Sequence, residues 1–263
     1  MTPRRTGILG GSFDPIHWGH LRLALEAAQA ARLDRVLLVV SKDPPHKQPD
    51  TPAAQRLEMA ALGAGASGGP LEACGIELEL PGKGYAAQVV AALARAYPGE
   101  AFFYLVGSDL LPTLPYWKDS AQLLALAQVL CVPRPGWRLE EGVFQRLSAA
   151  CGGRVERLEI PVPEISSTQV RQLLRAGEPV EGLIPQPVFF FDLGGGAGGL
   201  CRGRKGPFGA SAPGIKRGTP CPSGRSPGLA GRTGGRGSAG KALGAGRSGP
   251  GRRNAGRRPG WRW

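Results

Sequence analysis

Apolar runs and helical periodicities alternate along the first 190 or so residues, separated by glycine and proline. Thr6–Leu9 is a short apolar run that ends in two glycines, and Leu21–Ala31 has apolar residues at helical spacing. "RVLLVV" (Arg35–Val40) is an unbroken β-branched and aliphatic run, which is typical of a strand buried on both faces. These three segments predict that the chain begins strand, helix, strand.

The same alternation continues to about residue 177. It predicts helices over 53–66 (fraying at its glycines), 85–97, 121–127, 140–150 and 167–177, and strands over 75–80, 101–107, 128–133 and 154–160. Strands alternating with helices in units of roughly 30 residues predict an α/β fold: a Rossmann-like, doubly wound parallel sheet in a single domain. Such sheets bind ligands beyond the carboxyl ends of their strands. The loops that follow the first, second and fourth predicted strands are therefore expected to share one edge.

Composition changes abruptly near residue 193. Residues 194–263 hold 23 of the 42 glycines and 15 of the 33 Lys and Arg residues, with neither Asp nor Glu. Residues 1–193 carry the remaining 18 basic side chains against 20 acidic ones, so the net charge of +13 belongs to the tail. A segment so poor in apolar side chains cannot offset its chain entropy. We expect one domain over 1–193 and a disordered Gly/Arg-rich tail that binds polyanions at most non-specifically.

The spacing of the cysteines and the length of the apolar runs indicate the cellular compartment. The five cysteines show no CxxC spacing, which favours reduced thiols over a disulfide framework. No apolar run reaches the roughly 18 residues of a membrane span, and the N-terminal apolar stretch is too short for a signal peptide. These patterns predict a cytoplasmic protein that does not enter a membrane.

The most distinctive stretch is "GGSFDPIHWGH", residues 10–20. A Gly-Gly turn after a strand lets backbone approach a phosphate, and the next helix offers its N-terminal N–H groups to an anion. His17 and His20 would face the same side of that helix start and stabilise charge on a transferring phosphoryl group. The alternatives are ordinary loop histidines or a metal site. A metal site would need further ligands, and the third histidine, His46, has no companion cysteine.

A second polar stretch, "ISSTQVR" (Ile165–Arg171), opens the helix predicted over 167–177. The hydroxyls of Ser166, Ser167 and Thr168 could cap the helix or bind phosphate, and Arg171 adds a forked cation one turn later. Taken alone, the stretch is more typical of an N-cap with a surface arginine. Beside the first loop, it favours a second phosphate contact.

Together these motifs resemble a known family. "GGSFDPIHWGH" is similar to the signature of the HxGH nucleotidylyltransferase superfamily, in the form found in bacterial nicotinate-nucleotide adenylyltransferases. "ISSTQVR" resembles that family's I-S-S-T-x-[IV]-R. "PPHK" and "GSDLLPTLPYWKDSAQLL" match it in order and spacing. The resemblance extends from residue 6 to about residue 188.

The resemblance implies transfer of the adenylyl group of ATP to nicotinate mononucleotide, giving deamido-NAD and pyrophosphate without a covalent enzyme intermediate. It implies Mg²⁺ that bridges phosphate oxygens with mostly water ligands, and no protein metal site. The implied catalytic residues are His17, His20 and Arg171. The implied ATP contacts are Gly10, Gly11, Ser12, Phe13, His17, His20, Gly107, Asp109, Ser167, Thr168 and Arg171. The implied acceptor contacts are Asp14, Lys47, Tyr85 and Trp117, with Trp117 stacked on the pyridine ring.

Two departures from the family pattern leave alternatives open. "GKGYAAQ" keeps Tyr85 but has Gly84 and Ala86 where the family has Ser and Thr, so nicotinamide mononucleotide or another phosphate acceptor is an alternative substrate. The family's closing V-x-x-Y-I helix is replaced by "FFFDLGGGAGG" and the basic tail, a change that suggests out-of-frame translation. The alternative outside enzymes is a polyanion-binding protein that acts through this tail.

Overall fold

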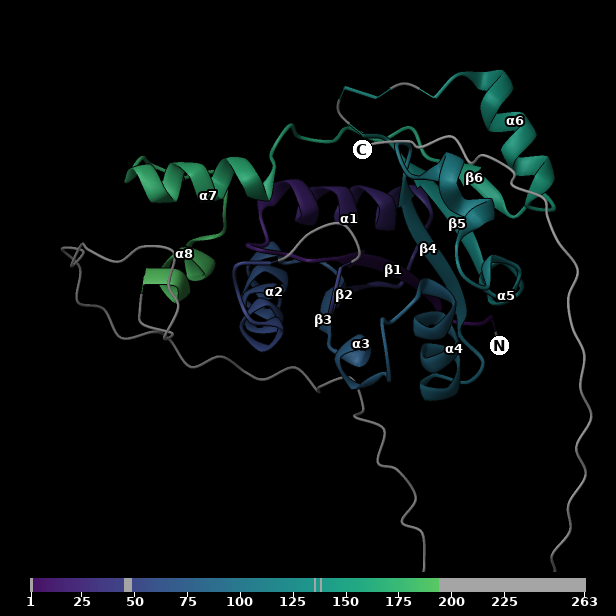
Figure 1. Ribbon diagram of the computed structural model, residues 1–263, viewed down its shortest axis with the longest axis horizontal. Coiled ribbons are helices and arrows are strands. Elements are labelled where there is room, and N and C mark those ends of the chain that lie inside the picture. Colours follow the sequence, from purple (N-terminus) through teal and green to yellow (C-terminus); the bar gives the residue numbers. More distant parts are fainter. Residues whose placement is uncertain (1, 45–48, 135, 138, 194–263) are drawn as a thin grey trace, which may run out of the picture. The chain divides into compact units, whose positions relative to one another are not determined.

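The computed structural model describes residues 2–44, 49–134, 136–137 and 139–193, so the predictions for Lys47 and for the tail lie outside the described residues. Six parallel strands form one sheet in the order β3-β2-β1-β4-β5-β6 (Figure 1). The strands are β1 Arg5–Gly11, β2 Arg35–Val40, β3 Leu71–Cys74, β4 Ala101–Gly107, β5 Ala127–Val132 and β6 Val155–Arg157. The predicted doubly wound parallel sheet is confirmed.

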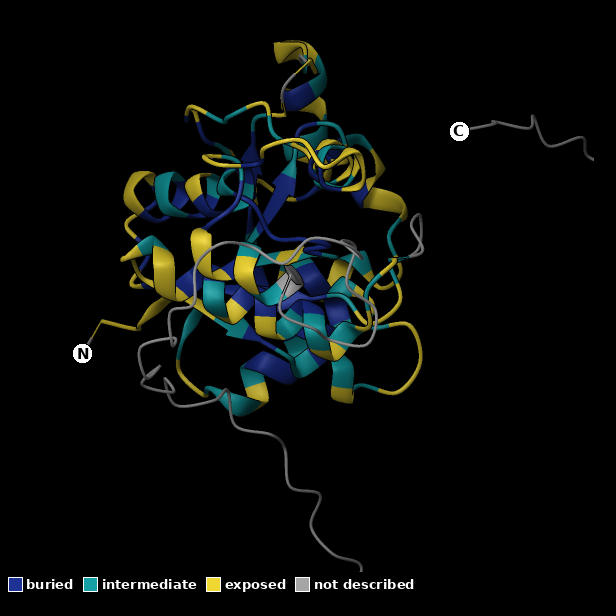
Figure 2. Ribbon diagram, turned by 90° about the vertical axis from the view of Figure 1, so that its left-hand side faces the viewer, coloured by how far each residue is buried: buried dark blue, intermediate teal, exposed yellow. Residues whose placement is uncertain are grey.

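Helices cover both faces of the sheet. The longer ones are α1 Trp18–Ala30, α2 Ala53–Ser67, α4 Ala86–Ala96, α5 Ser120–Leu126, α6 Glu141–Ala150, α7 Ser167–Ala176 and α8 Gln186–Leu193. The short ones are α3 Ile76–Glu79 and the 3₁₀ helix η1 Leu111–Tyr116. Helices α1 and α2 share one core with one set of strand residues, and α4, α5 and α6 share another with the alternate set. All six residues of β2 are buried because both faces are covered (Figure 2).

Two predictions of secondary structure were wrong, and one helix was missed. The segment 75–80 forms α3 rather than a strand, and the strand lies before it at 71–74. The alternation of Glu and Leu in this segment does not correspond to exposed and buried positions, because Glu77 is itself buried. Helix α2 does not fray at Gly63; a Cβ there would lie 3.0 Å from the Ile16 side chain, so this glycine allows close packing. Helix α8, whose Val188 is buried in the core shared with α2, was not predicted.

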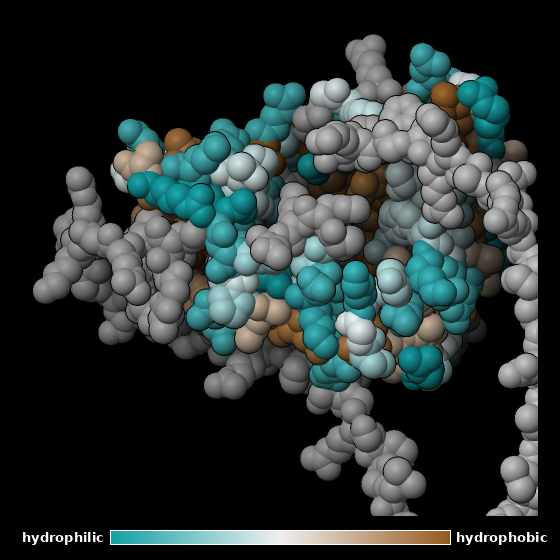
Figure 3. All heavy atoms as spheres, in the orientation of Figure 1, coloured by the Kyte–Doolittle hydropathy of each residue, from teal (hydrophilic) through white to brown (hydrophobic). Residues whose placement is uncertain are grey.

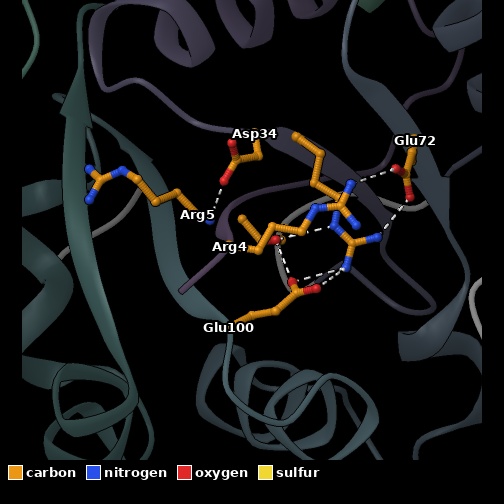
Figure 4. A network of polar contacts seen from close by, with 7 residues as sticks. Arg4, Arg5, Asp34, Glu72 and Glu100 are labelled. Atoms are coloured by element: carbon orange, nitrogen blue, oxygen red, sulfur yellow. Dashed lines mark hydrogen bonds and ion pairs between the residues drawn. The ribbon is translucent and has the colours of Figure 1, made fainter. Parts of the chain in front are cut away.

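A charged network ties the strands together at their amino ends (Figure 4). The guanidinium of Arg35, on β2, donates to Glu72 on β3 and to Glu100 just before β4, at 3.0 Å in each case. Its Nε donates to Thr6 Oγ1 on β1 at 3.1 Å. Arg35 is only 4% exposed, so its charge is compensated by these two carboxylates rather than by water. The network has a structural role at this edge of the sheet.

The carboxyl edge is open between β1 and β4. Pairing of these two strands ends at Ile8 and Tyr104. Each strand continues for three more residues, paired only with its outer neighbour, as far as Gly11 and Gly107. The strand order reverses at this point, and ligands of doubly wound sheets bind where the order reverses. In folds of this kind the ligand crevice lies at this point, which here falls between the loop after β1 and the loop after β4.

The sequence predictions on membrane spans and on cysteines can be checked over the ranges that the structure describes. Within those ranges no helix combines the length and apolarity that a membrane span requires. Cys131 and Cys151 are buried and form no disulfide, as predicted. Burial raises the pKa of the Cys131 thiol to about 11 and also raises that of Cys151, which keeps both thiols protonated.

Candidate active site

The two glycines that end β1 leave room for neighbouring rings. A Cβ on Gly11 would lie 2.9 Å from the ring of Phe13, and a Cβ on Gly10 would lie 3.3 Å from the Tyr104 hydroxyl. Phe13 itself has φ 48° and is buried, so the chain turns sharply here. Glycine at both positions allows backbone, rather than side chains, to line this side of the crevice.

The two histidines stack on each other at the start of α1. Their ring centroids are 3.7 Å apart at an interplanar angle of 24°, and His17 is 3% exposed. A Cβ on Gly19 would lie 2.8 Å from His17 Nδ1 and 3.2 Å from the Ile165 carbonyl oxygen, so only glycine fits between them. Two imidazolium charges this close would repel each other, and a bound anion would offset that repulsion. The pair is therefore suited to an anion whose charge grows during a reaction.

The second motif lies directly on the first loop. Ser166 caps α7 by accepting a hydrogen bond from Gln169 N at 3.1 Å, which confirms the N-cap interpretation for this residue. Ser167 Oγ donates to the Pro15 carbonyl at 3.1 Å, and Arg171 Nη1 donates to the Asp14 carbonyl at 2.6 Å. Helix α7 thus brings a serine, a half-buried arginine and an N-terminus to the histidine loop. Side chains over α7 on the visible face are mostly hydrophilic (Figure 3).

The residues predicted at the end of β4 form the other wall of the crevice. The Asp109 carboxylate folds back over Gly107 so closely that any side chain at Gly107 would overlap it. Arg134 Nε lies 3.7 Å from Asp109 Oδ2, and Arg134 N donates to Ser108 Oγ at 3.1 Å. Asp109 is therefore held at the mouth of the crevice with part of its carboxylate exposed.

Two of the predicted acceptor residues lie on the β4 side. The Trp117 ring meets Tyr104 edge-on with centroids 6.2 Å apart, and its Nε1 donates to Thr113 Oγ1 at 2.8 Å. Tyr104 connects Trp117 to Gly10 at the point where β1 and β4 separate. Tyr85 precedes α4 and is 42% exposed. The rings of Trp117 and Tyr104 give the β4 side an aromatic surface, and no ring contact joins Tyr85 to it among the described residues.

Asp14, the third predicted acceptor residue, is placed differently. It is 2% exposed, and its Oδ2 accepts a hydrogen bond from Asp50 N at 2.8 Å. Contact with a substrate through this carboxylate would require the loop to move. In the structure Asp14 joins the histidine loop to the loop that follows β2.

Sequence reasoning missed a buried arginine beneath the histidine loop. Arg56, on α2, is 1% exposed; it donates through Nη1 to the Ser12 carbonyl at 2.7 Å and through Nε to the Thr51 carbonyl at 3.0 Å. Burial lowers the pKa of the Arg56 guanidinium, and the nearby charges of Asp14 and Glu77 oppose that shift only in part. A single arginine in a helical pattern carries no signal of this role, because most arginines lie at the surface.

Glu77, also missed, lies between the loop after β2 and the loop before α4. It is 6% exposed, its Oε1 accepts from Lys42 N at 2.9 Å, and its side chain occupies the space next to Gly84, where φ is +60°. Burial raises the pKa of the Glu77 carboxyl to about 7, although the Lys42 N–H and the charge of Arg56 oppose the shift. The nearby Tyr104 hydroxyl has a raised pKa from burial and from the Glu77 charge. A serine at Gly84 would overlap Glu77, which accounts for one departure from the family pattern.

The Glu77→Gln variant is expected to change how stability depends on pH. The folded state keeps Glu77 protonated up to about pH 7, whereas the unfolded side chain loses its proton near 4.5. Between these values the folded state binds more protons, so the free energy of unfolding falls as pH rises, by at most about 1.4 kcal/mol per pH unit. Urea titrations from pH 4 to pH 8 should show this fall in the wild type and a shallower one in Glu77→Gln. Identical slopes would contradict a raised pKa.

Comparison with known proteins places the chain among nucleotide-transferring enzymes. The cytidylyltransferase-like family matches residues 8–173. A probable nicotinate-nucleotide adenylyltransferase of Shewanella sp. (strain MR-7) is 38% identical over 198 residues, covering 69% of this chain and 93% of that protein. The protein of the same name from Thermus thermophilus is 38% identical over 184 residues, covering 70% of this chain and 94% of the relative.

Solved structures share the fold. Plasmodium falciparum nicotinic acid mononucleotide adenylyltransferase complexed with NaAD superposes with a TM-score of 0.59 at 17% identity, over 73% of this chain and 95% of that one. The same protein complexed with APC gives a TM-score of 0.57 at 16% identity. At this level of identity the likeness concerns the path of the chain, including the order of its strands.

Proposed function

Because the chain belongs to the cytidylyltransferase-like nucleotidyltransferases, and among them to the nicotinate-nucleotide adenylyltransferase family, we propose that it transfers the adenylyl group of ATP to nicotinate mononucleotide, with deamido-NAD and pyrophosphate as products. The observation that carries this proposal is the meeting of the two phosphate-type motifs at the open edge of the sheet. The stacked histidines follow the loop after β1 along the chain, and Arg171 donates to the Asp14 carbonyl within that loop.

In the proposed reaction, the phosphate of the acceptor attacks the α-phosphorus of ATP, and the bond to the β-phosphate oxygen breaks. His17 and His20 face the α-phosphate and stabilise the charge that moves onto its oxygens. Backbone from Gly10 to Phe13 and the N-terminus of α7, with Ser167 and Thr168, hold the polyphosphate. Arg171 stabilises the departing pyrophosphate. Gly107 and Asp109 lie on the adenosine side, where a carboxylate accepts from a ribose hydroxyl.

Mg²⁺ enters this proposal as part of the nucleotide substrate. Over the described ranges, no group of three potential ligands lies close enough to hold a metal ion. Mg²⁺ commonly binds through substrate phosphates and water with few protein ligands, so in this proposal the nucleotide carries the ion. The ion supplies charge neutralisation on the phosphates.

The acceptor is proposed to bind on the β4 side, with its pyridine ring on Trp117 and Tyr85. The exposed position of Tyr85 and the hydrogen bond that orients the Trp117 ring support this assignment. The proposed contact with Lys47 lies outside the described residues. Ala86 cannot supply the hydroxyl that the family places there, and the backbone N–H of Trp117 already donates to the Leu114 carbonyl at 3.1 Å, so neither group is assigned to the nicotinate carboxylate.

The test is pyrophosphate release from ATP and Mg²⁺ with either nicotinate or nicotinamide mononucleotide, in the wild type and in Ala86→Thr. We expect the wild type to prefer the nicotinate form and Ala86→Thr to increase that preference roughly tenfold, the effect of one added hydrogen bond to a charged group. Ala86→Ser is the matched variant, because it adds a hydroxyl without the methyl group.

Preference of the wild type for the amide would overturn the proposed acceptor but keep the chemistry. Absence of pyrophosphate release with both acceptors, from a protein with a cooperative thermal transition, would overturn the proposed function.

A further inference from the structure

Asp50 joins three segments that meet at the proposed polyphosphate site. Its carboxylate oxygen Oδ2 lies 2.6 Å from Arg175 Nη2 and 3.3 Å from Arg171 Nε, both on α7. Its backbone N–H donates to Asp14 Oδ2, in the histidine loop, at 2.8 Å. Asp50 itself belongs to the loop between β2 and α2. One residue of this loop therefore contacts both motifs.

These contacts hold the Arg171 guanidinium on two sides. Nη1 donates to the Asp14 carbonyl at 2.6 Å, and Nε lies against Asp50 at 3.3 Å. A guanidinium is a planar fork, so the hydrogen bond from Nη1 and the ion pair at Nε together restrict the orientation of the whole group. The Arg171 side chain is 21% exposed, so part of it is accessible to a ligand.

We propose that Asp50 is a positioning residue, which orients Arg171 toward the leaving pyrophosphate and makes that orientation depend on the loop after β2. This inference rests on the proposed function for the identity of the anion. Asp50 thereby links the loop after β2 to helix α7 and to the histidine loop. A role through Arg171 differs from a role in folding, since the Asp50 side chain is 45% exposed and exposed ion pairs stabilise proteins little.

The predicted kinetic effect follows from where Arg171 acts. Charge grows on the pyrophosphate as its bond to the α-phosphorus breaks, so a misdirected guanidinium loses more in the transition state than in bound ATP. Removing the Asp50 charge also removes a repulsion that ATP meets on binding. Asp50→Asn should therefore lower kcat by roughly tenfold and change the KM for ATP by less than about threefold.

The experiment measures steady-state kinetics for Asp50→Asn, Arg171→Ala and the double variant. If Asp50 acts through Arg171, the double variant should match Arg171→Ala within about twofold. Glu141→Gln is the matched control. It removes an exposed carboxylate on helix α6 that pairs with Arg157 of β6 at 2.7 Å. Losses that multiply in the double variant, or an Asp50→Asn effect no larger than that of Glu141→Gln, would overturn the proposal.

Titration calorimetry with inorganic pyrophosphate separates this inference from the proposed function, because it needs no acceptor. We expect Asp50→Asn to weaken pyrophosphate binding several-fold in the wild-type background and to leave it unchanged in the Arg171→Ala background. If the binding results follow this pattern but the enzyme turns over neither acceptor, the positioning role is supported and only the proposed function is overturned. Normal turnover with independent effects of the two substitutions, or no pyrophosphate binding by the wild type, would overturn the positioning role.

Discussion

His17→Ala is expected to lower kcat for pyrophosphate release by roughly 10²–10³, the usual loss when one donor to a developing oxyanion is removed. The reason lies in the arrangement of the ring: His17 is 3% exposed, stacks on His20 and is enclosed by Gly19 and the Ile165 carbonyl. The ring has little freedom, so it stabilises a transition state without a reorganisation cost. The measurement is kcat and KM with ATP varied at saturating acceptor.

Two comparisons test whether the loss comes from chemistry. His17→Asn keeps a polar group near the Nδ1 position and should fold as well as the wild type by thermal denaturation, yet remain strongly impaired. Because the rings act as a stacked unit, the His17→Ala/His20→Ala double variant should lose less than the product of the single losses. A loss confined to KM would mean that His17 binds ground-state ATP and does not stabilise the transition state.

Much of the fold could be predicted because its signals are local. The uninterrupted apolar run of β2 indicated a doubly covered strand, and helix periodicity located α1, α4 and α7 to within a few residues. Ser167 and Arg171 contact the histidine loop through the carbonyls of Pro15 and Asp14, and the phosphate contact that the two motifs predict stays a prediction.

The residues that could not be predicted owe their roles to tertiary burial. Arg56 belongs to a mostly apolar helical segment and Asp50 to a loop between prolines, and only the fold brings them to the histidine loop and to helix α7. The alternation of Glu and Leu at 75–80 predicted a half-exposed strand, because it placed both glutamates on the solvent face. In the structure the Glu77 carboxylate is buried and accepts a hydrogen bond from Lys42 N. A pattern of apolar and polar residues cannot predict a buried carboxylate, because it assigns charged residues to the surface.

Arg56→Met is expected to cost about 3 kcal/mol of unfolding free energy, the lower end of the range for removing one member of a buried charge cluster. Methionine keeps most of the apolar stem but leaves the Ser12 and Thr51 carbonyls without this donor and the carboxyl groups of Asp14 and Glu77 without its charge. For a domain of this size the melting temperature should fall by roughly 6–12 °C. Urea denaturation and thermal scans at pH 7.5 measure both quantities.

The cost of Arg56→Met should depend on Glu77, because much of it arises from stranding a negative charge rather than from losing a contact. Glu77→Gln in the Arg56→Met background removes one stranded charge and keeps an oxygen for Lys42 N, so it should restore part of the stability at pH 7.5. The same rescue should be smaller at pH 5, where Glu77 is already protonated in the folded state. Equal rescue at both pH values would assign the penalty to the Ser12 and Thr51 carbonyls, and no rescue would show that Asp14 carries the electrostatic cost.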